Sequence, residues 1–377
     1  MSAWAGKYVI GLTGNIATGK SVVRKMLEHL GAYGIDADAL GHRAIAKGAP
    51  GYKPVLSAFG TWILGSDGQI DRSRLARVVF SDPDALAQLE NIVHPLVEQA
   101  IDILVRRSKQ QVIVIEAIKL IEANLLDYCD SVWVTYAQDY VQLARLKQKR
   151  YMDEESARQR IEAQPPQEQK KSVADIVINN DGSFENTWRQ VNSAWETLFP
   201  VVEPVPSQPV RALKGEMSVQ RAGPRDAGEI AKLITFITGG KRRLSRADVM
   251  AAFGEKAFLI LKLDGESVGL VGWKVENLVA CTDDVYIETQ IDLTKSLRAL
   301  MTEVERASRE LQCEISLLFL PRTLTGQEGS LHQLGYRQRS IQSLGVRAWQ
   351  EAASESMPNG TLLLFKQLRQ DRVLKPV

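Results

Sequence analysis

The chain has few of the residues that mark several classes of protein. Its 377 residues include only three cysteines, Cys129, Cys281 and Cys313, which are too isolated to indicate a disulfide framework or a metal-binding motif. No stretch reaches the roughly 18 uncharged apolar residues of a membrane-spanning helix. The first residues lack the apolar core and cleavage site of a signal peptide. We therefore predict a cytoplasmic protein with reduced thiols and no membrane segment.

An excess of charge of one sign is also missing. Forty-seven Lys and Arg residues face 45 Asp and Glu residues, a formal charge of +2, so we expect neither nucleic acid nor a membrane surface as a partner. The composition, 45% hydrophobic and 24% charged, is that of folded globular protein. The length suggests two or three domains.

The first part of the chain alternates strand and helix patterns. Apolar runs predict strands at Tyr8–Leu12, Tyr33–Ile35, Val112–Ile115, Val132–Thr135 and Ile176–Ile178. Helical periodicity predicts helices at Ser21–Leu30, Ser73–Phe80, Asp84–Arg107 and Asp139–Lys149. Strands that alternate with helices predict an α/β domain in which helices flank a parallel, five-stranded sheet.

A proline-rich stretch divides the chain. Four prolines between residues 200 and 209 predict a linker at residues 200–215, between a domain at 1–199 and a second at 216–377. In the second part we expect helices at Asp226–Ile237 and Leu293–Leu311. We expect strands there at Ala257–Leu263, Ser267–Val275, Ile315–Leu320 and Thr361–Lys366. This pattern indicates an α+β domain.

The clearest motif is a phosphate-binding loop. The sequence Gly14-Asn15-Ile16-Ala17-Thr18-Gly19-Lys20-Ser21 fits G-x-x-x-x-G-K-[ST], with a predicted strand before it and a predicted helix after it. Its backbone N–H groups and the helix N-terminus suit phosphate oxygens. We expect Lys20 to reach the β- and γ-phosphates of a nucleoside triphosphate and the Ser21 hydroxyl to ligate Mg²⁺. The loop alone leaves a GTPase switch, a mechanical ATPase and a small-molecule kinase open.

Carboxylates follow two of the predicted strands. Asp36 and Asp38 come after the second strand, where a carboxylate beside the γ-phosphate could accept the proton of an attacking hydroxyl. The alternative is that either aspartate caps the next helix. Glu116 ends the third strand, where an acid could hold Mg²⁺ or its water, or be an ordinary strand-end carboxylate.

Cations are dense between Arg145 and Lys171. Most lie at helical spacing among acids and are best explained as a solvated face. A kinase nevertheless needs one or two mobile cations that close over the phosphates.

From about residue 7 to 199, the chain resembles the dephospho-CoA kinase family. The resemblance rests on seven blocks in order: GLTGNIATGKS at 11–21, IDADALGH at 35–42, FG…DGQIDRSRLARVVF at 59–80, NIVHPLV at 91–97, RLKQKR at 145–150, RIEAQPPQEQK at 160–170 and ADIVINNDGS at 174–183. It implies a P-loop kinase fold with a lid, and phosphorylation of the ribose 3′-hydroxyl of dephospho-CoA by ATP with Mg²⁺.

The resemblance also implies roles for particular residues. Asp38 matches the catalytic acid, Thr13 a residue beside the loop, and Arg145 the lid arginine that contacts the ATP phosphates, while Lys20 stabilises the transferring group. His94 lies where the family shapes its acceptor pocket, although a hydrogen-bonded hinge histidine is an equal explanation.

The chain departs from the family in two places. The family's D-x-P-L-L-x-E stretch is Glu116-Ala117-Ile118-Lys119-Leu120-Ile121-Glu122 here, with isoleucine in place of proline. A family arginine four residues after Arg145 is Lys149, which lacks a bidentate fork. We expect an active kinase because Lys20, Ser21, Asp38 and Arg145 are all present.

The second part resembles GNAT-type N-acetyltransferases more faintly. The resemblance rests on Val219–Ala222 with Asp226, a predicted hairpin at Gly265, and Leu334-Gly335-Tyr336. The stretch Asp292–Leu297 stands where that family has a glycine-rich pyrophosphate loop, but it contains no glycine. We therefore favour a structural or regulatory role for the second domain over acetyl transfer. Three interpretations remain: a kinase with an accessory domain, a bifunctional kinase and acetyltransferase, and a nucleotide-gated interaction module.

Overall fold

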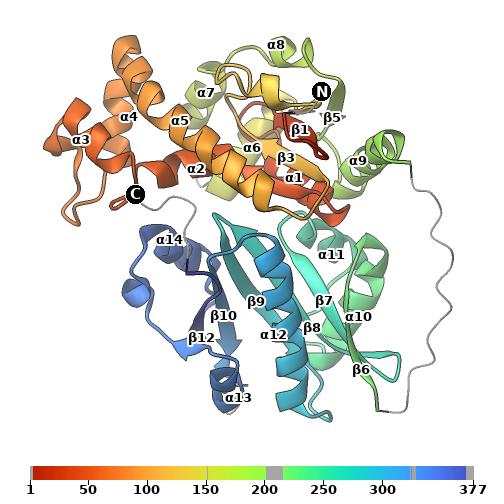
Figure 1. Cartoon of the computed structure of the whole chain (residues 1–377). Helices are drawn as coiled ribbons and strands as arrows, with labels where there is room; N and C mark the ends of the chain where they lie inside the picture. The colour runs from red at the N-terminus through yellow and green to blue at the C-terminus, as the bar shows by residue number, and fades with distance from the viewer. Residues whose placement is uncertain (1–2, 151, 201–214, 323, 325–327, 371–377) are drawn as a thin grey trace.

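The structure is a computed structural model that describes residues 3–150, 152–200, 215–322, 324 and 328–370. The first half of the chain forms a five-stranded parallel sheet in the order β2-β3-β1-β4-β5 (Figure 1). Its strands are β1 (Tyr8–Thr13), β2 (Tyr33–Asp36), β3 (Val112–Glu116), β4 (Ser131–Tyr136) and β5 (Ile176–Asn179). Its helices are α1 (Lys20–His29), α2 (Ala37–Ala44), α3 (Tyr52–Phe59), α4 (Arg72–Ser81), α5 (Pro83–Arg107), α6 (Asp139–Arg150), α7 (Glu154–Glu162), α8 (Gln167–Lys171) and α9 (Phe184–Leu198). All five strands predicted for this half are confirmed.

Helices cover both faces of this sheet because successive side chains of its strands point to opposite faces. In β1, Val9 packs in one apolar cluster with α2 and α5, whereas Ile10 packs in another with α1 and α9. Strand β3 is buried at every residue, as expected for a strand covered on both sides. Because the strands are parallel, the segments that follow β1, β2 and β3 meet at one edge of the sheet, where α/β proteins bind ligands.

The second half forms a seven-stranded sheet in the order β11-β12-β10-β9-β8-β7-β6. Its strands are β6 (Met217–Arg221), β7 (Ala257–Leu263), β8 (Glu266–Glu276), β9 (Val279–Ile287), β10 (Ile315–Pro321), β11 (Arg337–Gln338) and β12 (Thr361–Gln367). Its helices are α10 (Ala227–Ile237), α11 (Arg246–Ala252), α12 (Leu293–Glu310), α13 (Glu328–Gln333) and α14 (Arg347–Ser356). Among the described strands of this second sheet, only β9 and β10 pair in parallel. Helix α12 packs in one apolar cluster of this sheet, and α10 and α11 pack in another.

Strand β9 is not among the strands that the sequence predicts. Asp283 and Asp284 interrupt its apolar pattern. Both carboxylates are paired with Lys256, whose Nζ lies 2.6 Å from Asp283 and 2.9 Å from Asp284, and Arg242 adds a second cation to Asp284 at 3.0 Å. Pairing offsets the cost of placing two part-buried acids in a strand, and it depends on residues distant in sequence.

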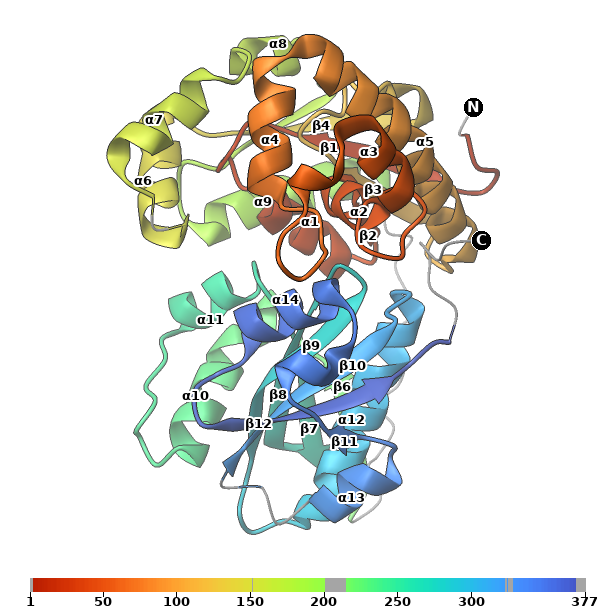
Figure 2. The same cartoon turned by 90° about the vertical axis from the view of Figure 1, so that its left-hand side faces the viewer.

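The two halves pack against each other. Helices α1 and α2 face α11, α14 and the tip of the β8–β9 hairpin (Figures 1 and 2). Residues 201–214, most of the predicted linker, lie outside the described residues. Every helix in the described part of the chain is too short or too polar to cross a bilayer.

Candidate functional site

The loop between β1 and α1 has the backbone that phosphate binding requires. Ala17 and Gly19 adopt left-handed φ angles of 58° and 95°. Helix α1 then begins at Lys20 with no acid in its first turn, and no described side chain caps it by a hydrogen bond. Its first N–H groups and the positive end of its dipole are therefore available to an anion.

Gly19 is required by space as well as by backbone angle. A Cβ at this position would lie 1.9 Å from Nδ2 of Asn180. That amide donates to the Thr18 carbonyl at 2.8 Å, and its Oδ1 accepts from the Thr187 hydroxyl at 2.8 Å. Asn180 thus supports the end of the loop, a role that the sequence did not suggest although the residue lies in the last family block.

Lys20 lies inside the loop. Its Nζ donates to the Gly14 carbonyl at 2.9 Å and to the Asn15 carbonyl at 3.1 Å, and the residue is buried. The ammonium is therefore held beside the amides of the loop. When phosphate is bound, its oxygens can replace these carbonyls as the acceptors of the Lys20 hydrogen bonds.

Ser21 and Glu116 meet, as the magnesium prediction requires. The Ser21 hydroxyl donates to Oε1 of Glu116 at 2.8 Å, and Arg24 Nε donates to Oε2 at 2.6 Å. No group of three or more potential His, Cys, Asp or Glu metal ligands occurs among the described residues. A hydroxyl and one carboxylate still fit Mg²⁺, which commonly takes one or two protein oxygens and completes its shell with phosphates and water.

The two aspartates at the end of β2 and the start of α2 have different hydrogen-bond partners. Asp36 caps α2, because its Oδ1 accepts from the Ala39 N–H at 2.8 Å. Asp38 instead accepts from the Ile118 N–H at 3.1 Å. Burial, followed by the negative charge of Asp36, raises the pKa of the Asp38 carboxyl to about 6, against the opposing effect of the Ile118 hydrogen bond. The capping alternative therefore applies to Asp36, and Asp38 has the raised pKa of a general base.

The departure from the family at residue 118 contributes directly to this arrangement. A proline would have no N–H to donate to Asp38. The neighbouring Lys119 lies on the surface, where its Nζ pairs with Glu90 at 2.8 Å.

Arg145 reaches the loop from α6. Its Nη1 donates to the Ala17 carbonyl at 3.0 Å and its Nη2 to the Asn180 carbonyl at 2.6 Å. The predicted lid arginine therefore lies against the phosphate loop.

Further contacts hold the phosphate loop and the segment after β3, and they include two residues predicted for the site, Asn15 and Thr13. Gln164 accepts from the Ile16 N–H at 2.8 Å, and Asn15 donates to the Pro165 carbonyl at 2.9 Å. The Ile118 carbonyl accepts from buried Lys170 at 2.7 Å and from the Thr13 hydroxyl at 3.2 Å. Gln164 and Lys170 lie in the block at 160–170, which was the available sequence signal.

Comparison with known proteins connects this site to a family. The family model described as dephospho-CoA kinase matches residues 8–186. The dephospho-CoA kinase of Geobacter metallireducens is 45% identical over 191 residues, which are 50% of this chain and 95% of that protein. The dephospho-CoA kinase of Aquifex aeolicus is 42% identical over 190 residues, 50% of this chain and 96% of that protein.

Two solved structures are similar to parts of the chain. The dephospho-CoA kinase from Campylobacter jejuni is 26% identical and covers 51% of this chain and 97% of its own, with a TM-score of 0.37. A GNAT-family acetyltransferase from Staphylococcus aureus is 12% identical and covers 41% of this chain and 100% of its own, with a TM-score of 0.33. Because the chain spans almost the whole length of relatives with 42% and 45% identity, it belongs, through its first half, to the dephospho-CoA kinase family.

Proposed function

We propose that this chain transfers the terminal phosphoryl group of ATP to the ribose 3′-hydroxyl of dephospho-CoA, which gives coenzyme A. One observation carries the proposal: Asp38, with its raised pKa, lies on the same edge of the sheet as an uncapped helix N-terminus that bears Lys20. Such an arrangement suits phosphates and a hydroxyl that must lose a proton. Membership of the family supplies the two substrates.

The proposed roles follow from these positions. The loop amides from Gly14 to Ser21 hold the phosphates, Lys20 and Arg145 stabilise charge on the transferring group, and Asp38 orients the hydroxyl and takes its proton. The hydroxyl oxygen bonds to the γ-phosphorus, the bond from that phosphorus to the bridging oxygen breaks, and ADP leaves.

Mg²⁺ is proposed as the partner of ATP, held by Ser21 and by Glu116 directly or through water. When bound, the ion would neutralise charge on the phosphates. The Ser21–Glu116 hydrogen bond supports this assignment because it brings both oxygens to one place. Arg24 fixes the other carboxylate oxygen and so limits how Glu116 can turn.

We propose that residues 1–199 are the kinase domain, 200–215 the linker and 216–377 an accessory domain. The alternative, a second acetyl-transfer activity, has little support. Asp292 caps the N-terminus of helix α12, where its carboxylate accepts from the Lys295 N–H at 3.0 Å, and an anion there repels a pyrophosphate. Tyr336, the residue that could act as an acid in acetyl transfer, is instead fully buried against Ser316, with 2.9 Å between the hydroxyls.

We also propose that the protein works in the cytoplasm. The free thiols of Cys129, Cys281 and Cys313 support a reducing compartment.

A coupled assay of ADP formation with ATP and dephospho-CoA tests the kinase. We expect turnover with the wild type and none with Lys20→Ala. An inactive wild type would overturn the proposal, and a fully active Lys20→Ala variant would overturn the assignment of the loop. Titration of the full chain with acetyl-CoA in a calorimeter tests the alternative, and we expect no heat of binding at the second domain.

A further inference from the structure

The β8–β9 hairpin of the second domain has an unusual tip. Its two turn residues, Asn277 and Leu278, have left-handed φ angles of 50° and 62°. Tight hairpins favour glycine or asparagine at such positions, and a bulky side chain there is strained. Strain of this kind persists only where surrounding contacts determine the conformation. The strain at Leu278 must therefore be offset by contacts of its side chain.

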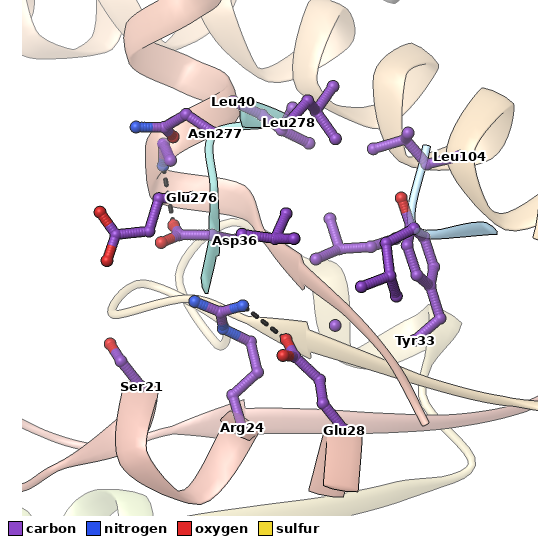
Figure 3. Close-up of a pocket in the computed structure, with 15 residues that line it drawn as sticks. Ser21, Arg24, Glu28, Tyr33, Asp36, Leu40, Leu104, Glu276, Asn277 and Leu278 are labelled. Carbon is purple, nitrogen blue, oxygen red and sulfur yellow. Dashed lines mark hydrogen bonds and ion pairs between the residues drawn. The ribbon is translucent and has the colours of Figure 1, made fainter. Parts of the chain in front are cut away.

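Leu278 is an apolar anchor in the kinase domain. It is buried in the same cluster as Leu40 of α2 and Leu104 of α5, although it belongs to the other half of the chain. Figure 3 shows Leu278 beside these two side chains, with α1 on the opposite side of the pocket. A glycine would suit the turn but leave this space empty.

Two kinase-domain cations hold the backbone of the hairpin. Lys25 of α1 donates to the Val275 carbonyl at 3.0 Å, and Arg43 of α2 donates to the Asn277 carbonyl. Arg43 also forms a buried ion pair with Glu314 of the second domain, at 2.5 Å. The tip is therefore fixed between α1 and α2.

From Lys25 a series of contacts leads to the phosphate loop. Lys25 pairs with Glu28 at 2.9 Å, Glu28 pairs with Arg24 at 2.7 Å, and Arg24 pairs with Glu116 at 2.6 Å. Glu116 in turn accepts from the Ser21 hydroxyl. The four charged groups of this series are largely buried, so water screens them little, and the series ends at Ser21 on the surface of the site.

From Arg43 the path to the site is one short helix. Arg43 is in the last turn of α2, and Asp38 is in its first turn. A cavity of about 190 Å³ separates the hairpin from the site and is lined by Ser21, Arg24 and Asp36 on one side and by residues 275–278 on the other (Figure 3). The second domain therefore forms one wall of a space that the phosphate-loop serine also lines.

We propose that the hairpin tip is a positioning device. By holding α1 through Lys25 and α2 through Arg43 and Leu278, the second domain keeps Ser21, Glu116 and Asp38 in their working arrangement. Full kinase turnover therefore needs the docked second domain. This inference rests on the proposed kinase function and gives the second domain its role.

The test compares two full-length variants at adjacent left-handed positions. Leu278→Gly relieves the turn and removes the anchor. Asn277→Gly relieves the turn in the same way but keeps the Leu278 anchor and the backbone carbonyl that Arg43 contacts. Because the Asn277 side chain is exposed, its removal opens no cavity. We expect Leu278→Gly to lower kcat by about 10- to 100-fold with a smaller change in KM for ATP. Asn277→Gly should keep the wild-type kcat, and Leu278→Met should restore most of it.

Hydrogen exchange in the same samples reports positioning directly. In Leu278→Gly we expect faster exchange of amides in α1 and α2, while those of β1 and β3 stay protected. If Leu278→Gly does not fold, Lys25→Met provides the test, because it removes the Val275 contact and opens no cavity at the anchor.

If the hairpin only stabilises the fold, Leu278→Gly should lower the thermal midpoint of unfolding and leave kcat unchanged at temperatures well below that midpoint. This result would overturn the inference. So would equal losses in the two glycine variants. An inactive wild type would instead overturn the proposed function, and the exchange measurement would still report on docking.

Discussion

The raised pKa of Asp38 leads to a prediction about the pH dependence of the kinase. Burial and the charge of Asp36 raise the pKa of its carboxyl from 3.8 to about 6. If Asp38 accepts the hydroxyl proton, only its ionised form is active. At pH 5 about one tenth of the molecules would then be ionised, whereas almost all would be with an unshifted pKa. We expect kcat/KM to rise about tenfold between pH 5 and neutral pH, measured with saturating ATP in the ADP-coupled assay.

Two variants should move the acidic limb of the pH profile, the rise in kcat/KM between pH 5 and neutral pH, in opposite directions. Asp36→Asn removes the neighbouring charge and keeps a side chain that can cap α2, so the limb should shift to lower pH. Ile118→Pro introduces the residue that is usual in the family and removes the N–H that favours the ionised form of Asp38. The limb should therefore shift to higher pH. If neither variant moves the limb, Asp38 is not the group that titrates.

The same pKa predicts an effect on stability. Because the folded-state pKa is above the unfolded one, the folded state binds this proton more tightly, and the free energy of unfolding falls as pH rises from about 4 to about 6. A shift of about two units corresponds to about 3 kcal/mol at neutral pH.

Asp38→Asn should therefore raise the free energy of unfolding in urea by up to that amount at neutral pH, and by little near pH 4. It should also lower kcat by about 10²- to 10⁴-fold while ATP still binds. A variant that is less stable than the wild type at neutral pH, or that turns over at the wild-type rate, would refute the reasoning.

Three further perturbations test other parts of the structure. Gly19→Ala places a Cβ 1.9 Å from Nδ2 of Asn180 at a left-handed φ, so calorimetry should show at least about a tenfold loss of ATP affinity; unchanged affinity would contradict the loop geometry. Glu314→Gln leaves Arg43 buried without its carboxylate and should cost about 3–5 kcal/mol in urea unfolding. The double variant with Arg43→Met should cost much less, and equal losses would argue against a buried pair. His29 Nε2 donates to the Phe253 carbonyl at 2.8 Å across the domain interface, where burial, with Arg221 and Lys25 nearby and the Phe253 hydrogen bond and Glu28 opposing them, lowers the pKa of His29 to about 4. Stability should therefore fall as pH drops from about 6.5 toward 4, His29→Gln should flatten this dependence, and an identical pH profile in that variant would exclude His29 as its cause.

Local sequence determined the phosphate loop and the strands around it. Eight consecutive residues carry the loop because its chemistry needs glycines, a lysine and a hydroxyl at fixed spacing. The five parallel strands were equally predictable from their short apolar runs, which are uninterrupted in β3, the strand that is buried at every residue. Asp38, Arg145, Ser21 and Glu116 could be proposed for the site because each follows a strand or lies in a family block.

Tertiary structure alone decided how these residues divide their tasks. Only packing makes Asp36 the cap and leaves Asp38 to the Ile118 N–H, and only packing brings Asn180 against Gly19. The docking of the second domain likewise depends on contacts between residues more than 200 positions apart, such as Arg43 with Glu314. Periodicity shows which face of a segment is buried, and motifs show where its loops and turns lie. The pairing of buried charges and the filling of space depend instead on which distant segments the fold brings together.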